Sequence, residues 1–179
     1  NDGNISQERL EDCINSDLAN NYGNLCQRVT AFAIKNCDGK IPAEIKFQDD
    51  DLLILNKYKD NLDNIRSQID NQNINFYIDY IVNSLFEANK YFNDQEPWKK
   101  KDDLIRLNTI VYTTFEIVRK ISFLLYPIIP ESSLKALKIF DIKENKIELH
   151  TISNNEYLIK GNNLIKIDIL FKKIEKNND

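Results

Sequence analysis

The chain has 179 residues, of which 42% are hydrophobic and 29% are charged, and this composition is typical of one globular domain with a sizeable core. No apolar run approaches the length of a membrane span and no signal peptide begins the chain, so we expect a cytoplasmic protein that binds no membrane. The net charge of −4 argues against a protein that holds DNA or RNA chiefly by counterion release.

Hydrophobic periodicity predicts an all-α protein. Apolar residues recur at intervals of three and four through most of the first 140 positions, and glycine or proline interrupts the pattern between segments. The short connections favour an antiparallel helix bundle. We expect helices over Gln7–Ile14 after an Ser6 N-cap, Asn15 to about Cys37, Asp51–Asp70, Asn75–Phe92, Asp102–Tyr126, and Pro130 to Ala136 or Leu137.

The chain changes character after Phe140, so we expect a helical domain over residues 1–141 and a tail over residues 142–179. Apolar residues cluster in three tail segments between turn signals, namely Ile147–Ile152, Glu156–Lys160 and Leu164–Phe171. Such segments can pair as short strands or pack as an extended tail. We expect this tail to return to the bundle or to a domain outside the chain.

The cysteines and the single histidine indicate no catalytic or metal site. Cys13, Cys26 and Cys37 form no CxxC pair, and we expect them to be reduced core residues. His150 lies in the tail and is expected at the surface. A lone histidine also leaves no nucleophile and base arrangement that involves histidine.

Three residues form a candidate reader of an unstacked RNA base. Asn24 and Arg28 are four apart, so they project from one face of a helix and offer an amide and a guanidinium together. Trp98 follows Pro97, which excludes it from a regular helix interior and favours a loop. An aromatic ring on a loop can stack on a base whose edge the polar groups read.

Lys99, Lys100 and Lys101 follow the tryptophan directly and can attract phosphate despite the acidic average. Each of these residues also has a purely structural interpretation. The lysines can be a solvated helix start, Asn24 can hydrogen-bond within the bundle, Arg28 can pair with an acidic neighbour, and Trp98 can anchor the end of the core.

Three blocks of the sequence resemble the anticodon-binding half of bacterial methionyl-tRNA synthetase. These blocks are residues 15–28, the run Ala88–Tyr91 leading into Pro97-Trp98-Lys99, and Leu125–Pro130. Residues 1–6 look like the segment that follows the catalytic domain there, and residues 166–175 are similar to the closing segment of shorter members. The resemblance covers about residues 1–141 and implies a class I synthetase anticodon-binding bundle.

The resemblance also implies a function. Trp98 would stack on the first base of the CAU anticodon of methionine tRNA, a cytosine, while Asn24 and Arg28 would bind its polar edge. The parent enzyme would join methionine to this tRNA with ATP bound in its catalytic domain, which would be a partner of this chain. The chain itself has no HIGH or KMSKS motif, P-loop or zinc pair, so we expect it to be non-catalytic and without a cofactor.

Two other functions remain open at this point. The chain could be the anticodon domain of another class I synthetase, or a helical protein-interaction module that binds no RNA.

Overall fold

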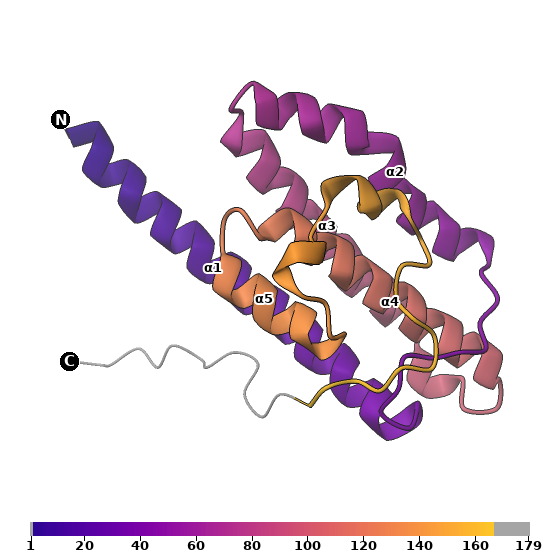
Figure 1. Cartoon of the computed structure of the whole chain (residues 1–179). Coiled ribbons are helices and arrows are strands. Elements are labelled where there is room, and N and C mark those ends of the chain that lie inside the picture. Colours follow the sequence, from indigo (N-terminus) through magenta and orange to yellow (C-terminus); the bar gives the residue numbers. More distant parts are fainter. Residues whose placement is uncertain (1, 167–179) are drawn as a thin grey trace, which may run out of the picture.

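The structure, a computed structural model, describes residues 2–166 and the side chains of residues 15–166 (Figure 1). Within these residues it contains five α-helices and no named strand, which confirms the all-α class expected from the periodicity. The helices are α1 (Asp2–Asn36), α2 (Asp49–Asp70), α3 (Ile74–Gln95), α4 (Leu104–Leu125) and α5 (Pro130–Ile139). Consecutive helices α2, α3 and α4 reverse direction, as expected for an antiparallel arrangement (Figure 1).

Helix α4 is the centre of the bundle. Nearly every residue from Arg106 to Leu125 is buried, because α1, α2, α3 and α5 all pack against this helix. A helix covered on all sides needs apolar residues around its whole circumference. The buried threonine and serine hydroxyls fit this environment by binding carbonyls one turn back, as Thr114 does to Ile110 at 2.8 Å.

Helix α1 is one continuous helix, and the prediction of a separate short helix over Gln7–Ile14 is wrong. Asn15 and Ser16 resemble a helix boundary in sequence, yet no proline or glycine lies between Gly3 and Gly23 to interrupt the backbone. The other helix ends differ from the expected positions by three residues or fewer. Asn36 ends α1, and Gly39 supplies the left-handed backbone of the following turn, with φ of +66°.

The described part of the tail contains two short 3-10 helices, whereas the sequence indicated either short paired strands or an extended tail. Glu144–Lys146 and Leu149–Ser153 each form one, and a single isolated bridge joins Lys40 to Asn163 within residues 2–166. The described part of the tail thus has no paired strands, and residues 167–171 of the third segment lie outside it. Ile152, Leu158 and Leu164 instead insert into the core one at a time.

Polar groups of α4 hold this part of the chain against the bundle. Arg119 donates to the carbonyl oxygens of Thr151 and Asn154 at 3.0 and 2.6 Å, and its partner Glu116 accepts from the backbone N–H of Tyr157 at 2.7 Å. Lys120 donates to the side chain of Asn155 at 2.5 Å. These buried polar groups of α4 therefore satisfy backbone and side-chain groups in and after the second 3-10 helix.

No helix within residues 2–166 combines the length and the apolar character that crossing a bilayer requires.

Lys120 should make the free energy of unfolding rise with pH. Burial, and then the charge of Arg119, lower the pKa of its ammonium group from 10.5 to about 7. Between these values the unfolded chain binds a proton that the folded chain does not, so stability increases by up to about 1.4 kcal/mol per pH unit.

Urea denaturation between pH 7 and 8.5 measures this slope. We expect a steeper rise for the native chain than for Lys120→Met, while Lys57→Met, at the half-exposed end of a surface ion pair, keeps the native slope. Equal slopes for the native chain and Lys120→Met would contradict the pKa assignment.

Candidate nucleic-acid interface

A tight turn between α3 and α4 presents Trp98 at the surface. Glu96 ends α3 in a left-handed conformation with φ of +47°, and Pro97–Lys99 then forms one 3-10 turn. Pro97 is buried beneath this turn, whereas 40% of Trp98 is exposed. A core anchor would be almost fully covered, so the indole is available to a ligand.

Arg28 lies directly beside this tryptophan. Its guanidinium carbon is 5.0 Å from the ring centroid of Phe92 and 5.6 Å from that of Trp98. The two rings meet edge to face with their centroids 6.0 Å apart, and Phe92 is buried below. The exposed guanidinium is thus held over two aromatic rings by cation–π attraction.

The side chain of Asn93 also holds Arg28 in place. Its Oδ1 accepts a hydrogen bond from a terminal nitrogen of the guanidinium. The partner is therefore a neutral amide and not an acidic side chain, so the positive charge of Arg28 stays uncompensated by this contact. The remaining N–H donors of the guanidinium can face a ligand.

Asn24 lies one helical turn before Arg28 on the same face of α1 and is exposed. Among residues 15–166 no side chain forms a hydrogen bond with its amide, so this exposed group can face a ligand. The structure therefore brings Arg28 and Trp98 into contact and places Asn24 one turn away from them.

The three lysines after the tryptophan differ in their surroundings. Lys99 forms an ion pair with Glu96 at 2.6 Å, which reduces its local charge. Lys100 is half-buried and Lys101 is exposed, and neither forms an ion pair within residues 15–166. Lys100 and Lys101 are thus the better candidates for a phosphate contact.

Phe92 and Asn93 belong to this arrangement, although the sequence analysis does not name them as site residues. Their position one turn before the Pro97-Trp98 turn is the only sequence feature that links them to the site. Tertiary packing is needed to show that α1 passes beside them.

A buried ion pair fixes the helix ends that flank the tryptophan turn. Arg106 at the start of α4 donates two hydrogen bonds to the carboxylate of Asp51 in α2, at 2.8 and 3.0 Å. Arg106 also donates to Gln95 at the end of α3 at 2.7 Å, and Tyr91 donates to the same carboxylate. Three helices are therefore joined at the base of the turn that carries Trp98.

Burial by itself would raise the pKa of the Asp51 carboxyl. The hydrogen bonds from Arg106, Tyr91 and the backbone of Gln48 outweigh it and hold that pKa below its usual value. Asp51 thus remains ionised, and the network keeps its full set of charge-assisted bonds at neutral pH.

Asp51→Asn should lower the free energy of unfolding by about 3–5 kcal/mol at pH 7, because Arg106 would lose its charged partner in a buried position. The stability due to this carboxylate is present above the pKa of an unfolded aspartate and disappears as the pH falls through the lower folded pKa. The difference between native and mutant chains should therefore shrink between pH 5 and pH 2. Chemical denaturation at several pH values measures it.

Asp50→Asn is the matched control. It removes an exposed carboxylate from the same helical turn and should cost less than about 1 kcal/mol. If Asp51→Asn lowers the free energy of unfolding no more than Asp50→Asn does, the ion pair between Asp51 and Arg106 does not stabilise the turn.

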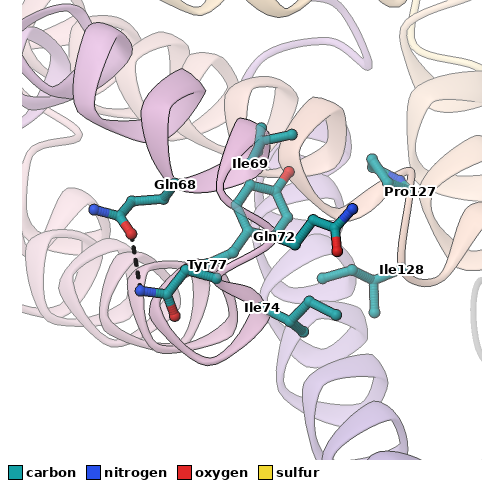
Figure 2. A pocket seen from close by; sticks show the side chains of 8 residues that line it. Gln68, Ile69, Gln72, Ile74, Tyr77, Pro127 and Ile128 are labelled. Carbon is teal, nitrogen blue, oxygen red and sulfur yellow. Dashed lines mark hydrogen bonds between the residues drawn. The ribbon is translucent and has the colours of Figure 1, made fainter.

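A separate groove of about 340 Å³ lies at the other end of the bundle (Figure 2). Its wall combines the α2–α3 turn with Pro127 and Ile128 of the α4–α5 connection, and Gln68 is hydrogen-bonded there to Asn73 at 2.9 Å. The lining carries amides, apolar groups and the phenol of Tyr77, whose hydroxyl donates to the carbonyl of Leu124, but no charged side chain. It therefore lacks the positive charge that would hold a phosphate.

The described residues offer no metal site. No group of three histidine, cysteine, aspartate or glutamate side chains gathers in that part of the chain. Cys26 is buried and burial raises the pKa of its thiol, while Cys37 is half-buried with its pKa raised to about 11. Both are free thiols, and the side chain of Cys13 lies outside those described.

Comparison with known proteins identifies the family of this chain. The sequence model described as the anticodon binding domain of methionyl tRNA ligase matches residues 41–179. A methionine–tRNA ligase of Brucella suis is 37% identical over 146 residues, which are 81% of this chain and 28% of the relative. The enzyme of the same name from Thermotoga maritima is 32% identical over 176 residues, covering 97% of this chain and 28% of the relative.

Solved structures agree with the sequence matches. Mycobacterium tuberculosis methionyl-tRNA synthetase in complex with methionyl-adenylate superposes with a TM-score of 0.81 and 32% identity, over 93% of this chain and 33% of that one. The chain thus spans about 30% of the length of these relatives. Because the family match covers most of the chain and the same fold is found in a solved relative, this chain belongs to the family of anticodon-binding domains of methionyl-tRNA ligases.

Proposed function

We propose that this chain reads the CAU anticodon of methionine tRNA as part of a methionine–tRNA ligase. The observation that carries the proposal is the contact between Arg28 and the exposed ring of Trp98, with the exposed amide of Asn24 one turn away. This arrangement offers a stacking surface and polar groups to the same base. The family membership of the chain supports it.

Stacking and hydrogen bonding can act together on a cytosine at the first anticodon position. The base would lie on the indole of Trp98, and its edge would meet Arg28 and Asn24. Cytosine offers a carbonyl oxygen and a ring nitrogen as acceptors and an amine as donor, which suits a guanidinium together with an amide.

Uracil would be rejected at the same position. Its ring N–H would face the N–H donors of Arg28, so polar groups would be left unpaired. Such a mismatch discriminates more strongly than a lost apolar contact. Lys100 and Lys101, which follow the tryptophan, would attract the neighbouring phosphates.

We place methionine activation outside this chain. Charging a tRNA requires ATP and an adenylate-forming centre, and this sequence offers no HIGH or KMSKS motif. The Mycobacterium tuberculosis relative is bound to methionyl-adenylate, which supports adenylate chemistry in the parent protein. The catalytic domain of the parent and methionine tRNA would then be the partners of residues 1–141, with residues 142–179 as a tail that packs back on the bundle or lies toward that domain.

Trp98→Ala should weaken binding of methionine tRNA by about 1–3 kcal/mol, the value of one base–aromatic stack. It should cost less stability than removing a core aromatic, because Trp98 is partly exposed. Filter binding and thermal unfolding of the same variant measure the two effects.

Phe115→Ala is the control, since this ring is buried in α4 and its loss should cost about 3–5 kcal/mol of stability. If Trp98→Ala unfolds as readily as this control and loses structure generally, Trp98 is an anchor and not a reader. A panel of tRNAs that differ in their anticodons would show whether the chain selects methionine tRNA.

Arg28→Ala in the parent enzyme should impair tRNA charging and leave methionyl-adenylate formation intact. Arg28→Lys should be a poor substitute, because an ammonium cannot match the planar donor set of a guanidinium. Pyrophosphate exchange and aminoacylation measure the two steps separately. Parallel loss of both steps, or full discrimination between cytosine and uracil by the lysine variant, would rule out Arg28 as the base reader.

A further inference from the structure

Phe92 occupies the point where Arg28 of α1 and Trp98 of the turn after α3 come together. Its ring is 1% exposed, so it belongs to the core. The guanidinium carbon of Arg28 lies 5.0 Å from the centroid of this ring, and the indole of Trp98 meets the ring at a centroid distance of 6.0 Å. A single buried ring thus contacts both exposed side chains of the candidate interface.

The ring of Phe92 is itself held in place from two directions. Phe32 of α1 packs edge to face against it, with the centroids 5.8 Å apart and the planes at 85°. Phe92 also lies in the last turn of α3, where Gln95 accepts a hydrogen bond from Arg106 of α4 at 2.7 Å. Because side chains in a packed core have little room to move, the ring offers a fixed surface to Arg28 and Trp98.

Arg28 needs such a surface more than a core residue would. It is exposed, and a long exposed side chain loses much rotamer freedom when a ligand immobilises it. The hydrogen bond to Asn93 fixes a single nitrogen of the guanidinium. The attraction between the guanidinium and the face of Phe92 adds a second point of attachment, so the group is held before any ligand is present.

We propose that Phe92 is a positioning residue for recognition of the first anticodon base. It holds the guanidinium of Arg28 and the indole of Trp98 in the geometry that one base requires, and its burial keeps it from touching the RNA itself. Side chains that are already ordered in the free protein lose less entropy on binding. The proposal rests on the proposed function, because this order matters only if Arg28 and Trp98 bind a base.

A purely structural role makes a different prediction. If Phe92 only fills the core, another apolar side chain that fills most of its volume can replace it. Leucine and methionine do so, but neither has the negatively charged ring face that attracts a guanidinium or a ring that can pair with the indole. Phe92→Leu and Phe92→Met therefore separate positioning from packing.

The free protein can be tested first, because Trp98 is the only tryptophan of the chain. Its fluorescence reports on this one ring. Phe92→Leu and Phe92→Met should lower the fluorescence anisotropy and shift the emission to longer wavelength, since the indole becomes more mobile and more exposed. Phe115→Leu is the matched control, because Phe115 is also 1% exposed and also packs edge to face, on Phe140. It should leave the Trp98 signal unchanged.

Binding of methionine tRNA gives the second measurement, with a variant that carries uracil at the first anticodon position for comparison. Ordering one side chain on binding corresponds to roughly a 2- to 13-fold weaker Kd, which we expect for both Phe92 variants. The ratio between the Kd values for the two tRNAs should also fall, because Arg28 is the residue that meets the base edge. Phe115→Leu should keep the native Kd and the native ratio.

The outcomes separate the role of Phe92 from the proposed function. If the Phe92 variants keep the native fluorescence or the native Kd, or weaken binding of both tRNAs by the same factor, the positioning role is overturned and the first-base site stands. An equal effect of Phe115→Leu, or loss of the native circular dichroism by both Phe92 variants, overturns it too, because the ring then serves the fold. If the native chain does not distinguish cytosine from uracil, the proposed function itself fails, whatever the fluorescence shows.

Discussion

The bidentate pair between Asp51 and Arg106 is the contact on which the candidate interface depends. It joins the start of α2 to the start of α4, and the bonds to Tyr91 and Gln95 add the end of α3. A buried ion pair contributes little net stability by itself, but it fixes geometry because neither charge can be left alone. The turn from Glu96 to Asp103 therefore has both of its ends fixed, and Trp98 is presented from a rigid base.

The central helix uses charge in a second way, away from this interface. Glu116, Arg119 and Lys120 are fully buried, and a helix interior would ordinarily exclude them. Each of them bonds to the segment that follows α5, which has few backbone bonds of its own. Buried charge thus replaces the hydrogen bonds that strands would have supplied, and the apolar residues Ile152, Leu158 and Leu164 fill the remaining space.

The polar residues of α1 and α3 form one candidate site only because the two helices lie side by side. The spacing on one helix predicts that Asn24 and Arg28 share a face, and the preceding proline predicts that Trp98 lies outside a regular helix. Phe92 and Asn93 lie on another helix, and their sequence pattern is that of an ordinary amphipathic segment. Their proximity to α1 reflects the parallel packing of helices that are separated by α2 in the chain.

The sequence by itself determined the helical class and the helix ends within about three residues from α2 onward, and it singled out Asn24, Arg28 and Trp98 as candidate base-reading residues. Periodicity, proline and helix spacing are local signals, and they act within a few residues. Tertiary structure decided that α1 is continuous, that the described part of the tail contains two short 3-10 helices, and that Arg28 lies against Phe92 and Asn93. These outcomes depend on which groups find partners far away in the chain, because an apolar segment such as Ile147–Ile152 becomes a strand only where an edge is available to pair with it.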